Sequence, residues 1–133
     1  MNKINADSTD YKDWLIIADN DYKFGNVSLE EFDEFYALIG YHFQQAGEKY
    51  LKAYIIKNNL DFKKTHDLPF LLSVCQNYEA EFEDLKEECS FLNRLSVDTR
   101  YPAVYDIGAT KEDAEQARDA AKKIGDFVKG KIK

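Results

Sequence analysis

The feature that most constrains the fold is a long helical period in the first half of the chain. It opens at a capping box, Ser28-Leu29-Glu30-Glu31, and meets no helix breaker until the pair Asn58-Asn59. A helix of this length measures roughly 45 Å. The period therefore predicts one long helix as the spine of the domain. Its apolar seam alternates in steps of four and three residues: Phe32, Tyr36, Ile39, Phe43, Ala46, Tyr50 and Ala53.

Two glycines lower the helix propensity of this spine but do not interrupt its apolar period. Gly40 and Gly47 lie seven residues apart and share one face of the helix. Each is less favourable in a helix than alanine by about 1 kcal/mol. We therefore expect another helix to cross closely at this face, where a larger side chain would not fit.

Capping residues and apolar stripes predict four further helices. The first ends at Gly25-Asn26, which tolerate a positive φ angle, and the last begins with Thr110 and Asp113. Short connections favour antiparallel neighbours. The sequence thus predicts an all-α, up-and-down bundle of about five helices with a long second helix, in one domain over residues 1–133. The predicted spans are about 9–24, 67–78 with Asp67 as N-cap and Pro69 in the first turn, 80–96 and 110–128.

Composition narrows the class of protein. The 133 residues carry a net charge of −7, so the surface is a poor general platform for nucleic acid, and we expect no DNA partner. No apolar run approaches the ~20 residues that span a bilayer, and the N-terminus lacks the apolar core of a signal peptide. We expect a cytoplasmic protein with no membrane association. Cys75 and Cys89 are predicted to be reduced thiols.

Three stretches, taken in order, resemble the HEPN domain family. The first is Asp13-Trp14-Leu15, in the opening helix. The second, residues 41–53, includes Gln44-Gln45-Ala46 followed by Glu48-Lys49 and is similar to the family's QQA-x-EK-x-LKA helix. The third joins Thr65-His66-Asp67-Leu68 to Arg100-Tyr101-Pro102, which look like the family's THDL and RYP signatures. Together they cover about residues 13–128.

The resemblance implies a five-helix bundle that is usually a homodimer and is encoded beside, or fused to, a minimal nucleotidyltransferase. It also implies nucleotide or RNA binding in a cleft between protomers. Many members of the family are ribonuclease toxins, with an arginine followed after four to six residues by a histidine. Here Arg100 is followed by Tyr105 at that spacing, and no histidine occurs after His66. We therefore predict no catalytic residue.

The candidate ligand-binding residues are Arg100, Tyr105 and His66. A guanidinium suits phosphate because it donates paired, charge-assisted hydrogen bonds, and Tyr105 could donate a further one or accept a nucleotidyl group. The structural alternatives are that Arg100 ties its loop to acidic side chains and that His66, beside the N-cap Asp67, is a structural hydrogen-bonding residue. No phosphate-binding glycine loop and no metal-binding spacing occurs, so no cofactor or metal is predicted.

Two polar features of the spine have plain structural interpretations. Glu48 and Lys52, four residues apart, are expected to form a solvated ion pair. His42 is expected at the edge of the core.

The leading function is then a non-enzymatic, dimeric binding module that works with a nucleotidyltransferase. The alternative is a toxin-type, metal-independent ribonuclease with a divergent site. Exposed aromatic side chains are a second motive for a homodimer: Phe24, Phe35, Tyr41, Tyr54, Tyr101 and Tyr105.

Overall fold

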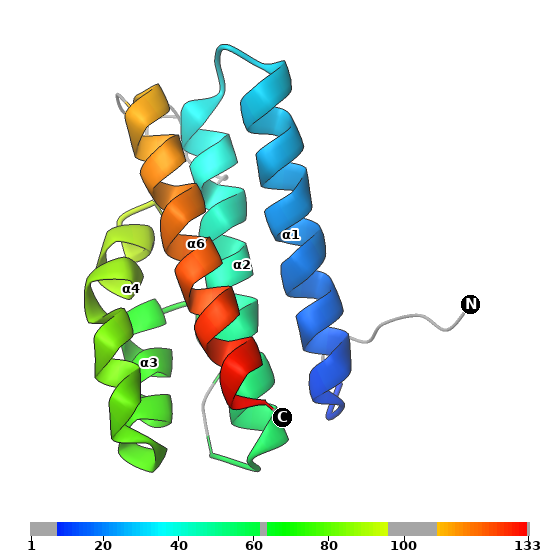
Figure 1. Ribbon diagram of the computed structural model, residues 1–133, viewed down its shortest axis with the longest axis vertical. Coiled ribbons are helices and arrows are strands. Elements are labelled where there is room, and N and C mark those ends of the chain that lie inside the picture. The colour runs from blue at the N-terminus through cyan, green and yellow to red at the C-terminus, as the bar shows by residue number, and fades with distance from the viewer. Residues whose placement is uncertain (1–7, 62–63, 96–108, 133) are drawn as a thin grey trace.

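The computed structural model describes residues 8–61, 64–95 and 109–132, and in this part of the chain every regular element is a helix. The all-α bundle predicted from the sequence is therefore confirmed (Figure 1). No helix among these residues is long and apolar enough to cross a membrane. The elements are α1 (Tyr11–Glu31), α2 (Tyr36–Lys57), α3 (Leu68–Tyr78), the 3-10 helix η1 (Ala80–Leu85), α4 (Lys86–Asn93) and α6 (Lys111–Lys131).

Helix α2 lies at the centre of the bundle and contacts each of the other four α-helices. In Figure 1, α1 lies on one side of α2 and α6, and α3 and α4 lie on the other. Helix α1 runs antiparallel to α2, since Asp19 meets Tyr50 while the later residue Gly25 meets the earlier residue Phe43. The spine predicted from the periodicity is thus the central element.

The direction of α3 refines the up-and-down arrangement. Gln44 hydrogen-bonds the backbone at His66, and Tyr54 hydrogen-bonds Glu79 beyond the end of α3. The contacts ascend together along both segments, so α3 runs parallel to α2 rather than antiparallel to it. This direction brings the start of α3 beside the middle of α2, where the candidate site lies.

The boundary between the first two helices differs from the prediction. Helix α1 continues through Gly25-Asn26 to Glu31, and α2 begins only at Tyr36, after Phe35 in a left-handed conformation with φ 65°. Gly25 does not end the helix. It admits the ring of Phe43, because a Cβ atom at this position would lie 2.7 Å from ring atom Cε1. Phe32, predicted in the seam, follows α1 and is 48% exposed. Helix α2 is therefore 22 residues long, one more than α1 or α6.

The predicted helix caps are confirmed, whereas the extent of the predicted fourth helix differs. Asp67 caps α3 by accepting the backbone N–H of Phe70, and Thr110 and Asp113 form a reciprocal capping box at α6. The predicted fourth helix begins as the 3-10 helix η1 and ends as an α-helix at Asn93, before the predicted residue 96. The two cysteines, which are free and buried, lie in α3 and α4.

The two spine glycines meet the neighbours that the sequence led us to expect. A Cβ atom on Gly47 would lie 3.0 Å from Leu92 of α4 and 3.3 Å from Ile124 of α6. A Cβ atom on Gly40 would lie 3.2 Å from Leu95. Close helix packing explains why residues of low helix propensity occupy the middle of the longest helix.

Candidate functional site

A fully buried carboxylate in the middle of α2 organises the candidate site. One oxygen of Glu48, Oε2, lies 2.6 Å from Nζ of Lys49 and 3.3 Å from Nζ of Lys52. The other oxygen, Oε1, lies 2.7 Å from Nδ1 of His66. We call Glu48, Lys49, Lys52 and His66 the Glu48 cluster. It joins one helix to the residue that precedes the cap of the next.

The central position of α2 explains why these polar groups are buried. Gln44 and Glu48 lie one helical turn apart, and both are fully buried. Gln44 donates a hydrogen bond of 3.5 Å to the backbone carbonyl of His66, while Glu48 holds the ring of the same residue. The Nζ atom of Lys52 lies 5.4 Å from the centre of the Trp14 ring, which ties α1 to the cluster.

The charges in the cluster shift two pKa values. Burial alone would raise the pKa of Glu48, but the charges of Lys49 and Lys52 and the hydrogen bond with His66 outweigh it. The pKa of Glu48 therefore lies below its ordinary value, and the group is a carboxylate at neutral pH. Burial lowers the pKa of Lys52, and Glu48 only partly opposes this effect. The ion pair holds both charges in a place that excludes water.

This arrangement corrects the prediction of a solvated ion pair. The side chain of Glu48 is 0% exposed and that of Lys52 is 9% exposed. His66 is the member that faces solvent, with 72% of its side chain exposed. The cluster therefore presents an imidazole to solvent and holds it from behind through a buried anion. The structural alternative for His66, a hydrogen-bonding residue beside the N-cap Asp67, is also compatible with this contact.

The local charge of the cluster is opposite in sign to that of the chain. Glu48 contributes −1 and Lys49 and Lys52 contribute +1 each, which gives +1 before any proton on His66 is counted. The whole chain carries −7. A net positive cluster in an acidic protein favours the approach of anions.

Arg100 and Tyr105 lie outside the described residues, so their position relative to His66 stays a prediction. The described ends of their segment are Leu95 and Ala109. Asn93, two residues before Leu95, accepts a hydrogen bond of 3.3 Å from the backbone N–H of Leu68 through its side-chain oxygen. The end of α4 and the start of α3 are thus neighbours.

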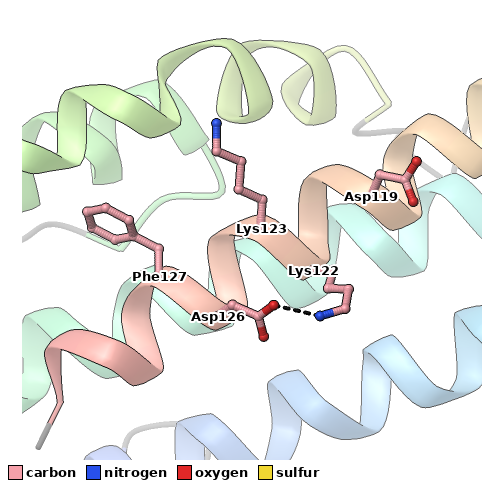
Figure 2. A pocket seen from close by; sticks show the side chains of 5 residues that line it. All are labelled: Asp119, Lys122, Lys123, Asp126 and Phe127. Atoms are coloured by element: carbon pink, nitrogen blue, oxygen red, sulfur yellow. Dashed lines mark hydrogen bonds and ion pairs between the residues drawn. The ribbon is translucent and has the colours of Figure 1, made fainter.

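The side chains that line the depression on α6 drawn in Figure 2 do not converge on one point. It has a volume of about 550 Å³ and is lined by Asp119, Lys122, Lys123, Asp126 and Phe127. Lys122 and Asp126 pair with each other at 2.6 Å on the side of α1, while Lys123 points away toward α4 (Figure 2). Within the described part of the chain, no group of three or more His, Cys, Asp and Glu could hold a metal ion.

Comparisons with known proteins agree with the geometry of the bundle. The sequence model of the family described as HEPN domain matches residues 11–131. The chain is similar to the crystal structure of ST0689, an archaeal HEPN homologue, with a TM-score of 0.71 and 26% identity over 100% of both chains. It is also similar to the crystal structure of TT1696 from Thermus thermophilus, with a TM-score of 0.75 and 29% identity over 93% of this chain and 99% of that one. No curated protein matches significantly.

Proposed function

Since this chain belongs to the HEPN domain family, we propose that it is a module that binds nucleotides or other phosphate-bearing ligands and works with a minimal nucleotidyltransferase. The partner is proposed from the resemblance of the QQA-x-EK, THDL and RYP stretches to nucleotidyltransferase-associated members. In this proposal His66, Arg100 and Tyr105 contact the ligand. The module acts by binding rather than by cleaving.

The observation that carries the proposal is the Glu48 cluster. It combines an exposed imidazole with a net positive charge in a chain whose overall charge is −7. Lys49 and Lys52 are largely buried, so they act on a ligand through their field rather than through contact. The connection between α4 and α6 follows Asn93, whose side chain contacts the start of α3, and Arg100 lies seven residues after Asn93. An extended chain spans at most ~3.3–3.6 Å per residue, so this separation along the chain permits Arg100 to contact the same ligand as His66.

Replacing Arg100 tests this assignment. We expect Arg100→Ala to weaken the binding of nucleotides and short RNA by roughly ten- to hundredfold, because hydrogen bonds to a charged group are strong. Calorimetric titration of wild type and variant measures the change. Arg118→Ala is a matched control, since Arg118 is paired with Asp119 on α6. Undiminished binding in Arg100→Ala removes this residue from the site, and rapid cleavage of RNA by wild type favours the ribonuclease alternative.

We also propose that the chain forms a homodimer, because apolar side chains gather where α1 meets α2. Phe24, Val27, Phe32 and Phe35 are between 48% and 59% exposed, and the rings of Phe32 and Phe35 lie 5.4 Å apart. We call these four residues the end patch. Tyr54, one of the aromatics predicted to be exposed, is 1% exposed and hydrogen-bonded to Glu79, so that part of the prediction was wrong. The end patch is sufficient to support the proposal.

Sedimentation tests the dimer. We expect wild type to sediment as twice the 15.4 kDa protomer at micromolar concentration, and Phe35→Glu to shift it toward the monomer. A charge placed in an apolar interface is left without a partner when water is excluded. Tyr78→Glu is the control, because Tyr78 is 59% exposed on α3, away from the end patch. A wild type that remains at 15.4 kDa contradicts the proposal.

A further inference from the structure

The contact between Glu48 and His66 decides which ring nitrogen carries the proton. A carboxylate has no hydrogen to give and can only accept. With Oε1 of Glu48 2.7 Å from Nδ1, the proton of the neutral imidazole is held on Nδ1. The other nitrogen, Nε2, then carries a lone pair. The short distance is typical of a hydrogen bond to an ionised acceptor.

The rest of the cluster favours this placement of the proton. Glu48 is 0% exposed, so water does not compete for Oε1. Lys49 and Lys52 both hold the other oxygen, Oε2, which keeps the group ionised and fixes its rotation. Gln44 holds the backbone carbonyl of His66. His66 is therefore held through both its ring and its backbone.

In this contact Glu48 is buried and His66 is exposed. A contact that served only stability would not require this division. Moving a carboxylate out of water costs several kcal/mol, which its partners must offset. Yet 72% of the His66 side chain remains in solvent, so the bond buries little of the ring. What the buried anion achieves is a fixed orientation and a fixed tautomer at the surface. A hydrogen bond at one ring nitrogen sets the state in which the other nitrogen meets a partner.

We infer that His66 accepts a hydrogen bond from a hydroxyl group of the ligand through Nε2, with Glu48 as the positioning residue. A neutral Nε2 lone pair repels the oxygens of a phosphate dianion and attracts the hydrogen of an alcohol. In a nucleotide the hydroxyl groups belong to the ribose. This inference rests on the proposed function and adds to it an orientation, in which the sugar, not the phosphate, lies over His66.

The tautomer can be measured without any ligand. The chain has two histidines, His42 and His66, so a long-range nitrogen–proton NMR spectrum contains two imidazoles, and His42→Phe assigns them. We expect neutral His66 to be protonated at Nδ1 in wild type. In Glu48→Gln the amide can either donate or accept, so we expect a mixture of tautomers. A wild-type His66 protonated at Nε2 overturns the inference.

Binding is measured with AMP and 2′,3′-dideoxy-AMP, which lacks both ribose hydroxyls. We expect the dideoxy nucleotide to bind wild type about three- to tenfold more weakly, as the loss of one neutral hydrogen bond predicts. His66→Phe should bind both nucleotides equally, whereas the control His42→Phe should keep the preference. His42 lies on another part of α2, beside Asp21 of α1, and 27% of its side chain is exposed.

The two proposals fail in different ways. Equal binding of AMP and its dideoxy analogue by wild type overturns the role of His66 and leaves the proposed nucleotide-binding function intact. A preference for AMP that survives in His66→Phe also overturns it, because another residue must then contact the hydroxyl. If wild type binds neither nucleotide, the inference is overturned, and the proposed function is overturned as well if wild type also fails to bind short RNA.

Discussion

Glu48→Gln should destabilise the fold by about 3–5 kcal/mol, the effect typical of removing one partner from a buried ion pair. The amide keeps the shape of the side chain and loses its charge. Lys49 and Lys52, which are 15% and 9% exposed, then lose the carboxylate that both of them contact. Domains of this kind have a total stability of ~5–15 kcal/mol, so the loss is a large fraction of it. Chemical unfolding at pH 7 measures the change.

The matched control is Asp126→Asn on α6. Asp126 pairs with Lys122 at 2.6 Å, the same distance as between Glu48 and Lys49, but the Asp126 side chain is 64% exposed. Water solvates both partners of that surface pair before and after the substitution, so we expect little change in the free energy of unfolding. Equal effects of the two substitutions would show that burial of Glu48 is not the cause.

The pH dependence has a definite sign. The pKa of Glu48 is lowered in the folded state, so its stabilising contribution is fully present above the unfolded-state pKa of about 4.3. The contribution is lost as pH falls through the lower, folded-state value. We therefore expect the difference in unfolding free energy between wild type and Glu48→Gln to shrink as the pH falls below ~4. A difference that grows in acid contradicts the assignment.

A second substitution separates the charge from packing. In Glu48→Gln with Lys52→Met, one of the two stranded cations is replaced by an apolar side chain of similar length. We expect this double variant to be more stable than Glu48→Gln alone, because unpaired buried charge is the main source of the loss. If the two substitutions simply add, the loss comes from disturbed packing instead.

The parts of the fold that the sequence predicted correctly depend on local chemistry. The caps at Asp67 and Thr110 involve residues within three positions of each other, and both have the predicted hydrogen bonds. The error at Gly25 arose because a glycine can end a helix or admit a neighbour. Only the position of Phe43, eighteen residues later, decides between the two. Such a contact between separate helices cannot be read from one segment of sequence.

The burial of the Glu48 cluster was missed for a related reason. Charged residues four apart on a helix are usually solvated, and Glu48 and Lys52 were interpreted in that way. A signal against this was present, since Leu51 and Ile55 add apolar residues outside the predicted seam, and both are fully buried. A helix that is apolar on more than one face is surrounded by other helices. Its charged residues then have to find partners inside the protein.

Phe43→Ala should also destabilise the fold by about 3–5 kcal/mol, the range for deleting a buried aromatic ring. Phe43 is 0% exposed, lies against Gly25 of α1 and makes an edge contact with Tyr22 at 5.7 Å. Its loss opens a cavity between α1 and α2. Thermal or chemical unfolding measures the change. Tyr78→Ala is the control, because that ring is 59% exposed and its removal leaves no cavity, so we expect a much smaller effect.

The cavity left by Phe43→Ala should reverse the effect of Gly25→Ala on the stability of the fold. In wild type, a methyl group at this position would lie 2.7 Å from the Phe43 ring, so Gly25→Ala should destabilise α1 against α2 despite alanine's higher helix propensity. In the Phe43→Ala background the obstacle is gone, and the methyl group enters the empty space. There Gly25→Ala should stabilise the fold by about 1 kcal/mol, the propensity difference between glycine and alanine in a helix. A double-mutant cycle measures the coupling between the two residues. If the effects of the two substitutions on stability are additive, contact with the Phe43 ring is not the reason that a glycine occupies position 25.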